Sequence, residues 1–228
     1  MTSDVFTVLV VCTGNVNRSA LGAVLLDTWA HWYLPAQLAG QVRVTSAGLR
    51  APVGAHMGRR ARVIAEALGA DGSGHAARQI SEEAIRGADL VLVSSGDQRD
   101  SVLGLVPGAL RSTFTIREAG RVAEGLRGDG APASVEELRA RVAELATNRS
   151  PVSGGDDDDI IDPQGKDDEA YRLMARQEVP PLTQIAGVLF GMPPAESAAY
   201  DEAAEAAEFS FSGEPVDARR RPRGRREA

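Results

Sequence analysis

The sequence predicts an α/β fold in which helices cover both faces of a parallel sheet. Short apolar runs recur along the first half of the chain, and such runs are typical of parallel strands buried on both faces. Helical patterns separate these runs, and alternating strands and helices favour a doubly wound sheet. The predicted strands are residues 5–11, 42–46, 89–93 and 112–116.

The helices between these strands are predicted from their residue patterns. Residues 19–34 are rich in alanine and leucine, and Pro35 stops this helix. Residues 58–68 place their apolar side chains on one helical face. Ser81, followed by two glutamates, is typical of the N-cap of a short helix.

The second half of the chain is predicted to be mainly helical. The pattern is interrupted at residues 126–132, which contain glycine and proline. After an acidic loop, a last helix is predicted over residues 167–190. Pro180 and Pro181 are expected to break or kink this helix near Val179.

The chain is predicted to divide into a main domain, residues 1–192, and a disordered tail, residues 193–228. The tail is alanine- and glutamate-rich over residues 196–208 and strongly basic over 219–226. Such a composition buries little apolar surface. The alternative role of the basic run is docking to an acidic partner, nucleic acid or a membrane surface.

The composition argues against several classes of protein. The 228-residue chain carries a formal net charge of −7, which disfavours a general nucleic-acid-binding surface. No run approaches the ~20 apolar residues of a membrane span, and no signal peptide is apparent. A single cysteine leaves no intramolecular disulfide and suits a reducing compartment. We therefore predict a cytoplasmic protein.

That cysteine, Cys12, begins the most informative segment of the chain. It follows the first predicted strand, and Arg18 stands at the start of the next predicted helix. Backbone N–H groups in such a turn can surround a phosphate, and the helix N-terminus adds partial positive charge. The arginine fork binds two phosphate oxygens, and the same field favours a thiolate nucleophile. The alternative is a small buried cysteine at the end of a core strand.

The segment Cys12-Thr13-Gly14-Asn15-Val16-Asn17-Arg18-Ser19 resembles the loop of the bacterial low-molecular-weight protein tyrosine phosphatases, whose signature reads Cys-x-Gly-Asn-x-Cys-Arg-Ser. Further matches follow in the family's order between residues 5 and 190, at 45–48, 74–79, 88–93 and 162–163. The resemblance implies a four-stranded, flavodoxin-like sheet and makes residues 1–192 the catalytic domain. It also implies hydrolysis of phosphotyrosine, or a related phosphoprotein ester, through a phosphocysteine, without a metal or other cofactor.

The resemblance assigns a role to each residue of the predicted site. Cys12 attacks phosphorus, Arg18 holds the phosphate oxygens, and Asp162 first protonates the leaving group and then activates water. Asp159 is the alternative acid. Asn15 is expected to adopt a positive φ, and the Ser19 hydroxyl to donate to the thiolate. The substrate-binding residues are Thr13, Gly14, Asn15, Val16, Asn17 and Ser19, and the supporting residues are Ser46 and His75.

The chain departs from the family pattern around the substrate slot. Asn17 replaces the second loop cysteine, and Ala20 replaces the usual proline. Gln164 and the pair Leu49-Arg50 stand where aromatic residues often occur. The residues that hold the phosphate are all present, but the slot that would bind an aromatic side chain lacks aromatic residues of its own.

Three alternatives to a tyrosine phosphatase follow. Thr13 also occurs in relatives that act on phosphoarginine, so protein-arginine phosphatase is the alternative function. Arsenate reductase is disfavoured because its chemistry relays electrons through further cysteines, which this chain lacks. A non-catalytic phosphate-binding module is disfavoured by the presence of Cys12, Arg18 and Asp162 together.

Overall fold

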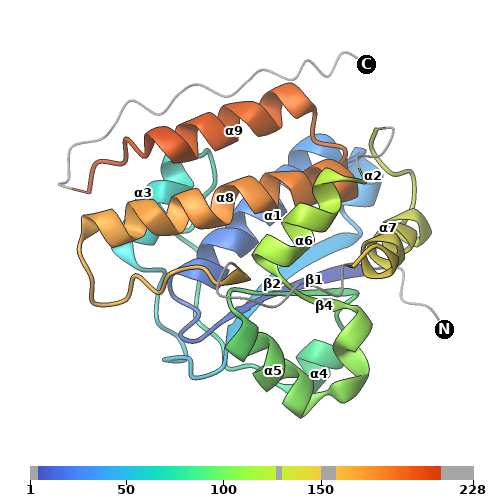
Figure 1. Ribbon diagram of the computed structural model, residues 1–228, viewed down its shortest axis with the longest axis horizontal. Helices are drawn as coiled ribbons and strands as arrows, with labels where there is room; N and C mark the ends of the chain where they lie inside the picture. Colours follow the sequence, from blue (N-terminus) through green and yellow to red (C-terminus); the bar gives the residue numbers. More distant parts are fainter. Residues whose placement is uncertain (1–4, 127–129, 150–157, 212–228) are drawn as a thin grey trace.

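The structure is a computed structural model of the chain, and it describes residues 5–126, 130–149 and 158–211. A parallel sheet lies at its centre (Figure 1). The strands are β1 (Phe6–Cys12), β2 (Val42–Gly48), β3 (Leu90–Val93) and β4 (Thr113–Thr115). They lie in the order β2-β1-β3-β4, and every neighbouring pair is parallel. The predicted four-stranded, doubly wound sheet is therefore confirmed.

The strand order places Cys12 at the functional edge of this sheet. The chain passes from β1 to β2 on one side and then returns to β3 on the other side of β1. The carboxyl end of β1 is thus the topological switch point, where open α/β sheets bind their ligands. Cys12 is the last residue of β1 and lies opposite Gly48 of β2.

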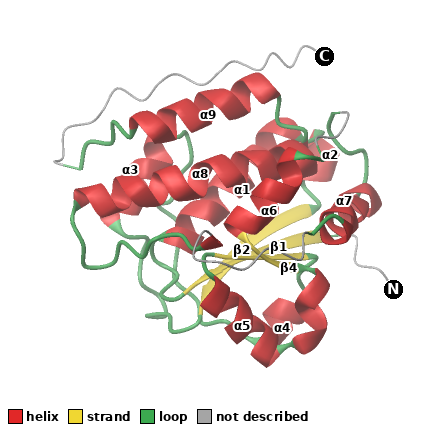
Figure 2. Ribbon diagram, viewed as in Figure 1, coloured by secondary structure: helices red, strands yellow, loops and turns green. Residues whose placement is uncertain are grey.

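Helices enclose the sheet on both faces (Figure 2). Alternate side chains of β1 enter two apolar cores, with Val8 and Val10 in the larger and Leu9 and Val11 in the smaller. This alternation follows from the period of two along a strand. The helices are α1 (Arg18–Tyr33), α2 (Ala36–Ala39), α3 (Arg59–Ala67), α4 (Glu82–Arg86), α5 (Gly96–Leu105), η1 (Pro107–Arg111, a 3₁₀ helix), α6 (Ile116–Glu124), α7 (Val135–Thr147), α8 (Asp168–Phe190) and α9 (Pro194–Ala206).

Helix α8 runs through both of its prolines as one continuous helix, so of the break or kink expected near Val179 the break does not occur. Helix α6 packs closely against α8 at the position of the two prolines. A Cβ on Gly120 of α6 would lie 2.4 Å from the Pro181 Cβ, and glycine leaves the space for that approach. The Thr183 hydroxyl lies 2.7 Å from the Pro180 carbonyl and 2.8 Å from the Asp201 carboxylate of α9, so α9 also contacts this part of the helix. Tertiary packing therefore outweighs the local preference of the two prolines.

The folded part of the chain extends beyond the predicted boundary at residue 192. Helix α9 packs on α8, and its Tyr200 ring lies 5.0 Å from the Trp29 ring, centroid to centroid. The segment that follows is also anchored, because Phe209 and Phe211 are buried and Arg59 donates to the Phe211 carbonyl at 2.5 Å. The prediction of disorder is therefore wrong for residues 193–211, while residues 212–228, with the basic run, lie outside the described part.

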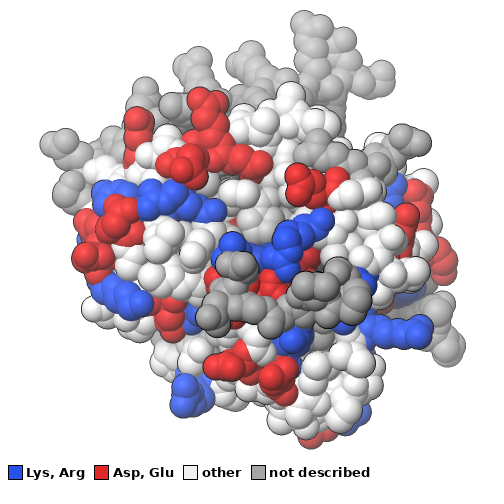
Figure 3. All heavy atoms as spheres, in the orientation of Figure 1, with Lys and Arg blue, Asp and Glu red and all other residues white. Residues whose placement is uncertain are grey.

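Helix α9 has a buried face, which its alanine- and glutamate-rich composition did not predict. Ser197, Tyr200 and Ala204 are buried, at the spacing of one helical face, and Ala207 continues it. On the side of the molecule seen in Figure 3, acidic and basic side chains are interspersed. None of the helices that the structure describes is both long and apolar enough to cross a membrane.

Candidate active site

The predicted phosphate loop connects β1 to α1. Its residues 13–17 lie between Cys12, where β1 ends, and Arg18, where the 16-residue helix α1 begins. The loop therefore surrounds the N-terminus of a long helix, where unpaired backbone N–H groups and the helix dipole favour an anion. This arrangement follows from the sequence, because only a short loop separates an apolar strand from an alanine- and leucine-rich helix.

Two donors approach the sulfur of Cys12, which is only 2% exposed. The Asn15 backbone N–H donates to Sγ at 3.2 Å, and the Ser19 Oγ lies 3.0 Å from Sγ. The Asn15 side-chain amide already donates to the same Oγ at 2.9 Å. Because Oγ accepts that bond, its own proton is free to point at the sulfur. Both donors stabilise a negatively charged thiolate.

Asn15 adopts the left-handed conformation expected for it, with φ of 53°. Three contacts hold it there. Its side-chain Oδ1 accepts from the Arg78 backbone N–H at 2.8 Å, its Nδ2 binds Ser19, and its carbonyl accepts from the His75 Nε2 at 2.7 Å. A Cβ on Gly48 would lie 2.8 Å from the Thr13 carbonyl, so the loop can approach β2 only over a glycine.

The structure brings His75 into this supporting network but not the side chain of Ser46. Ser46 lies in β2 opposite Val10, and among the described residues its hydroxyl has no hydrogen-bond partner in the loop. The longer contact of Ser19 Oγ, 3.5 Å, goes instead to the carbonyl of the next residue, Ala47. On this side the Ser19 hydroxyl therefore contacts a backbone carbonyl of β2 and not the hydroxyl of Ser46.

Arg18 joins the phosphate loop to the segment that carries Asp162. Its guanidinium is 6% exposed and its Nη2 lies 2.6 Å from the Asp162 Oδ2. Its Nη1 donates to the Ile160 carbonyl at 3.1 Å. Asp162 itself is half exposed, at 48%, and therefore lies at the mouth of the site rather than in the core.

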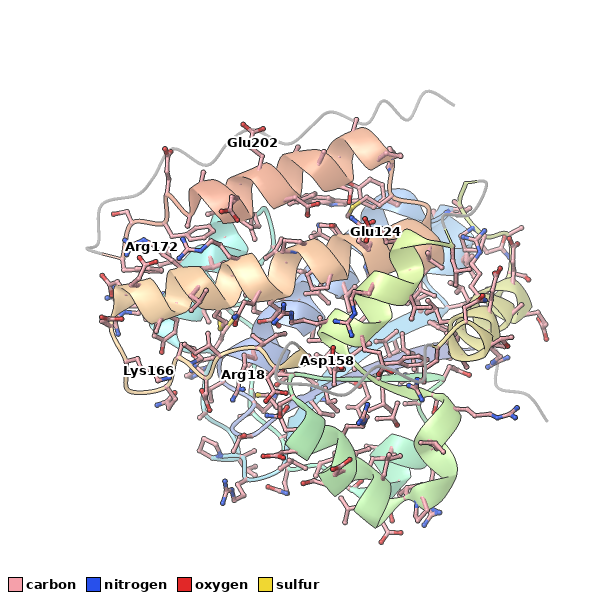
Figure 4. All side chains as sticks on the ribbon, in the orientation of Figure 1. Arg18, Glu124, Asp158, Lys166, Arg172 and Glu202 are labelled. Atoms are coloured by element: carbon pink, nitrogen blue, oxygen red, sulfur yellow. The ribbon has the colours of Figure 1, made fainter. Side chains whose placement is uncertain are left out.

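The two candidate acids have different partners. Asp159 accepts from the Gly96 N–H at 2.8 Å through its Oδ1, at the start of α5. Arg117 donates to its carbonyl at 3.1 Å. Asp159 is therefore bound to the starts of α5 and α6, whereas Asp162 is paired with Arg18. The neighbouring Asp158 is buried and pairs with Arg121 of α6, and Figure 4 shows Asp158 and Arg18 on the same side of α8.

Helix α5 contributes a residue that the sequence analysis missed. The Gln98 side chain donates to the Thr13 Oγ1 at 3.3 Å and accepts from the Ser94 N–H at 2.9 Å. It therefore holds the first residue of the loop after Cys12. The missed signal was Ser95, whose hydroxyl accepts from the Gln98 N–H at 3.3 Å, because serine followed three residues later by glutamine is typical of a helix start.

A cavity of about 250 Å³ opens over the loop, with no aromatic residue in its lining. A larger groove of about 1110 Å³ continues from it along α5 and shares Thr13, Arg18 and Asp162. Within the described part of the chain, no cluster of three or more His, Cys, Asp or Glu residues forms a metal site. The residues around the cavity are Cys12, Thr13, Gly14, Val16, Asn17, Arg18, Pro52, Asp162 and Gln164.

One protein family matches this chain. Residues 7–118 fit the model of the low molecular weight phosphotyrosine protein phosphatases. The low molecular weight protein-tyrosine-phosphatase Ptp of Acinetobacter johnsonii is 32% identical over 109 residues, which are 48% of this chain and 70% of that protein. The chain belongs to the low molecular weight phosphotyrosine protein phosphatase family.

This phosphatase is also similar to a relative named for another substrate. The protein-arginine-phosphatase of Geobacillus stearothermophilus is 31% identical over 142 residues, covering 62% of this chain and 90% of that protein. The structure of the YwlE arginine phosphatase from the same organism aligns with a TM-score of 0.55 at 26% identity, over 79% of this chain and 90% of that one. Both relatives are named as protein phosphatases, whereas the phosphorylated residues in their names differ.

Beneath the site, the phosphatase buries a carboxyl group that the sequence did not reveal. Glu178 of α8 is fully buried, and its Oε1 would lie 3.0 Å from a Cβ on Gly22, one turn after Arg18 in α1. Burial raises the pKa of Glu178 well above its ordinary value of 4.5, and the charge of Arg18 opposes this only in part. The carboxyl therefore keeps its proton in the folded state at pH values where the unfolded chain has lost it.

We expect the substitution Glu178→Gln to change how stability depends on pH. Above about pH 4.5 the Glu178 carboxyl keeps a proton in the folded state that it loses in the unfolded chain, so its contribution to the free energy of unfolding falls as the pH rises. The fall is about 1.4 kcal/mol per pH unit while this difference lasts. Glutamine does not titrate, so the variant should gain stability over wild type between pH 5 and pH 8 in urea unfolding. The control is Glu124→Gln on exposed α6 surface, and equal pH profiles for Glu178→Gln and wild type would contradict the expectation.

Proposed function

We propose that this phosphatase hydrolyses phosphotyrosine in proteins through a phosphocysteine on Cys12. The observation that carries the proposal is the convergence of three groups on one cavity. The thiol of Cys12, the guanidinium of Arg18 and the carboxyl of Asp162 all line it. These groups supply a nucleophile, a holder of phosphate oxygens and a proton donor, which are the needs of thiol-based ester hydrolysis.

The proposed reaction has two steps at phosphorus. In the first, the Cys12 thiolate forms an S–P bond while the P–O bond to the leaving group breaks, and Asp162 gives its proton to the departing oxygen. In the second, water attacks phosphorus, the S–P bond breaks, and Asp162 takes the proton from the water. Arg18 and the loop N–H groups hold the charge on the phosphate oxygens throughout.

The ion pair between Arg18 and Asp162 has to open during this cycle. A phosphate dianion in the loop competes for the same guanidinium, and bidentate binding of phosphate favours the exchange. Asp162, released from Arg18, can then carry the proton that the leaving group needs. The half-exposed position of Asp162 supports such a movement, because no packed core holds its side chain.

Protein-arginine phosphatase is the second candidate function. The cavity lining contains Val16, Pro52 and Gln164 but no aromatic ring among the described residues. An aromatic contact is worth about 0.5–1.5 kcal/mol, so its absence removes up to about a tenfold preference for a phenyl ring. The relative from Geobacillus stearothermophilus, which is named for phosphoarginine, supports the same alternative.

The test is to measure turnover of phenyl phosphate, a phosphotyrosine peptide and a phosphoarginine peptide of the same sequence side by side. We expect the first two to be hydrolysed, with a phosphotyrosine preference weaker than in relatives whose slot is aromatic. Turnover of the phosphoarginine peptide alone would replace the proposal by the second candidate. Absence of turnover on all three would contradict both.

A reduced Cys12 thiol suits a reducing compartment, which supports placing the enzyme in the cytoplasm. The proposed partner is a phosphorylated protein. Docking through the basic run at 219–226 stays a prediction about residues outside the described part.

A further inference from the structure

Two of the residues by which the chain departs from its family pattern contact each other. The Asn17 Nδ2 donates to the Gln164 Oε1 at 2.9 Å, although 147 positions separate them. Asn17 belongs to the phosphate loop, and Gln164 follows Asp162 and Pro163 in the acid-bearing segment. The bond therefore joins the two halves of the site directly.

This bond closes a ring of contacts around Asp162. The Gln164 backbone N–H donates to the Asp162 Oδ1 at 3.1 Å, and the Asp162 Oδ2 lies 2.6 Å from the Arg18 Nη2. Arg18 is the chain neighbour of Asn17, which returns the ring to its start. Asp162 is thus held from two sides, by Arg18 through charge and by Gln164 through a turn.

The Asn17 side chain is fixed more firmly than the Gln164 side chain. Asn17 is only 4% exposed, and its Oδ1 would lie 2.4 Å from a Cβ on Gly58, so the amide packs against the glycine backbone. The Gly58 N–H also donates to the Val16 carbonyl at 2.8 Å, which ties the same turn to the loop. Gln164 is exposed at the cavity mouth. The buried Asn17 side chain is therefore held in place by its surroundings, and its hydrogen bond holds the exposed side chain of Gln164.

The two sides of the ring differ once phosphate is bound. In the proposed reaction, phosphate competes for Arg18 and replaces its ion pair with Asp162. The Asn17–Gln164 bond involves neither the thiol nor the guanidinium, so phosphate can bind without breaking it. It is then a side-chain contact that joins the segment of Asp162 to the phosphate loop itself, while Gln177 of α8 holds the Ile161 N–H of the same segment at 2.8 Å.

We propose that Gln164 is a positioning residue for Asp162, with Asn17 as its support. The inference rests on the proposed function, because it assigns Asp162 the role of proton donor. It predicts that the pair matters for leaving groups that need a proton and not for binding of the phosphate itself. A neutral hydrogen bond of about 0.5–1.5 kcal/mol corresponds to an effect of about two- to tenfold.

A double-mutant cycle tests the proposal. The variants are Asn17→Ala, Gln164→Met and their combination, with Gln37→Met on exposed surface of α2 as the matched control. Each is assayed with phenyl phosphate, whose leaving group has a pKa of about 10 like tyrosine, and with nitrophenyl phosphate, whose leaving group departs without a proton. Inhibition by inorganic phosphate reports the integrity of the loop in each variant.

We expect Gln164→Met to lower kcat on phenyl phosphate about three- to tenfold, with nitrophenyl phosphate and phosphate inhibition changed less than about twofold. The double variant should lose no more than the larger single loss. Equal losses on both esters, or additive losses, would overturn the inference while leaving the proposed function intact. No turnover of either ester by wild type would overturn the proposed function and the inference with it.

Discussion

Replacing Cys12 with serine is expected to reduce turnover of every phosphate ester to background while phosphate still binds. The loop N–H groups and Arg18 that hold the oxyanion belong to other residues, and the substitution leaves them in place. A serine hydroxyl in this loop has no general base among its described hydrogen-bond partners, because Ser19 and the Asn15 N–H are both placed to donate. The nucleophile is therefore lost without loss of the anion site.

Two measurements separate this result from unfolding. Steady-state assays on phenyl phosphate give the loss of turnover, and titration calorimetry with inorganic phosphate gives the binding constant. Phosphate should also raise the thermal midpoint of the variant as it does that of wild type, since any ligand that binds only the folded state does so. Hydrolysis near the wild-type rate by Cys12→Ser would rule out Cys12 as the nucleophile.

Replacing Asp162 with alanine is expected to lower kcat on phenyl phosphate by about 10²–10⁴-fold, the usual contribution of a positioned proton donor. On nitrophenyl phosphate the loss should be far smaller, because that leaving group needs no proton. The same substitution removes the carboxylate that occupies the Arg18 Nη2. Inorganic phosphate should therefore bind about two- to fivefold more tightly, which corresponds to the strength of an ion pair whose carboxylate is half exposed.

Asp159→Ala is the matched control for this prediction. Its carboxylate is also exposed and lies only three residues earlier, yet it accepts from the Gly96 N–H at the start of α5. We expect its kcat on both esters to stay within a few-fold of wild type, with some loss of stability because the Gly96 N–H loses its acceptor. If Asp159→Ala shows the leaving-group-dependent loss and Asp162→Ala does not, the assignment of the acid is reversed.

The sequence determined the sheet and the phosphate loop because their signals are local. Each buried parallel strand is a continuous apolar run, and the loop lies within eight consecutive residues, from Cys12 to Ser19. Strand, turn and helix follow one another there, so the positions of the thiol, the loop N–H groups and Arg18 follow from chain order alone. Even the positive φ of Asn15 could be predicted, because asparagine tolerates it and the loop requires it.

The remaining features depend on contacts between distant segments. The stretch before Pro163 is rich in aspartates that look alike in sequence, and only contact with Gly96 or Arg18 distinguishes Asp159 from Asp162. Burial of Glu178 depends on how α8 crosses α1 at Gly22. The path of α8 through its two prolines depends on the close approach of α6. Local sequence preferences cannot predict these features, because the energies that decide them come from packing between distant segments and from the removal of water.

The bond between Asn17 and Gln164 shows the division most clearly. In the sequence the two residues look unrelated: Asn17 stands where the family has a second loop cysteine, and Gln164 stands where an aromatic residue often occurs. The fold brings them to 2.9 Å, where one amide binds the other. The amino-acid sequence alone determined which residues form the phosphate loop, because they are consecutive in the chain. Only tertiary structure decided what faces that loop, because a hydrogen bond across 147 residues forms only after the sheet and its helices have packed.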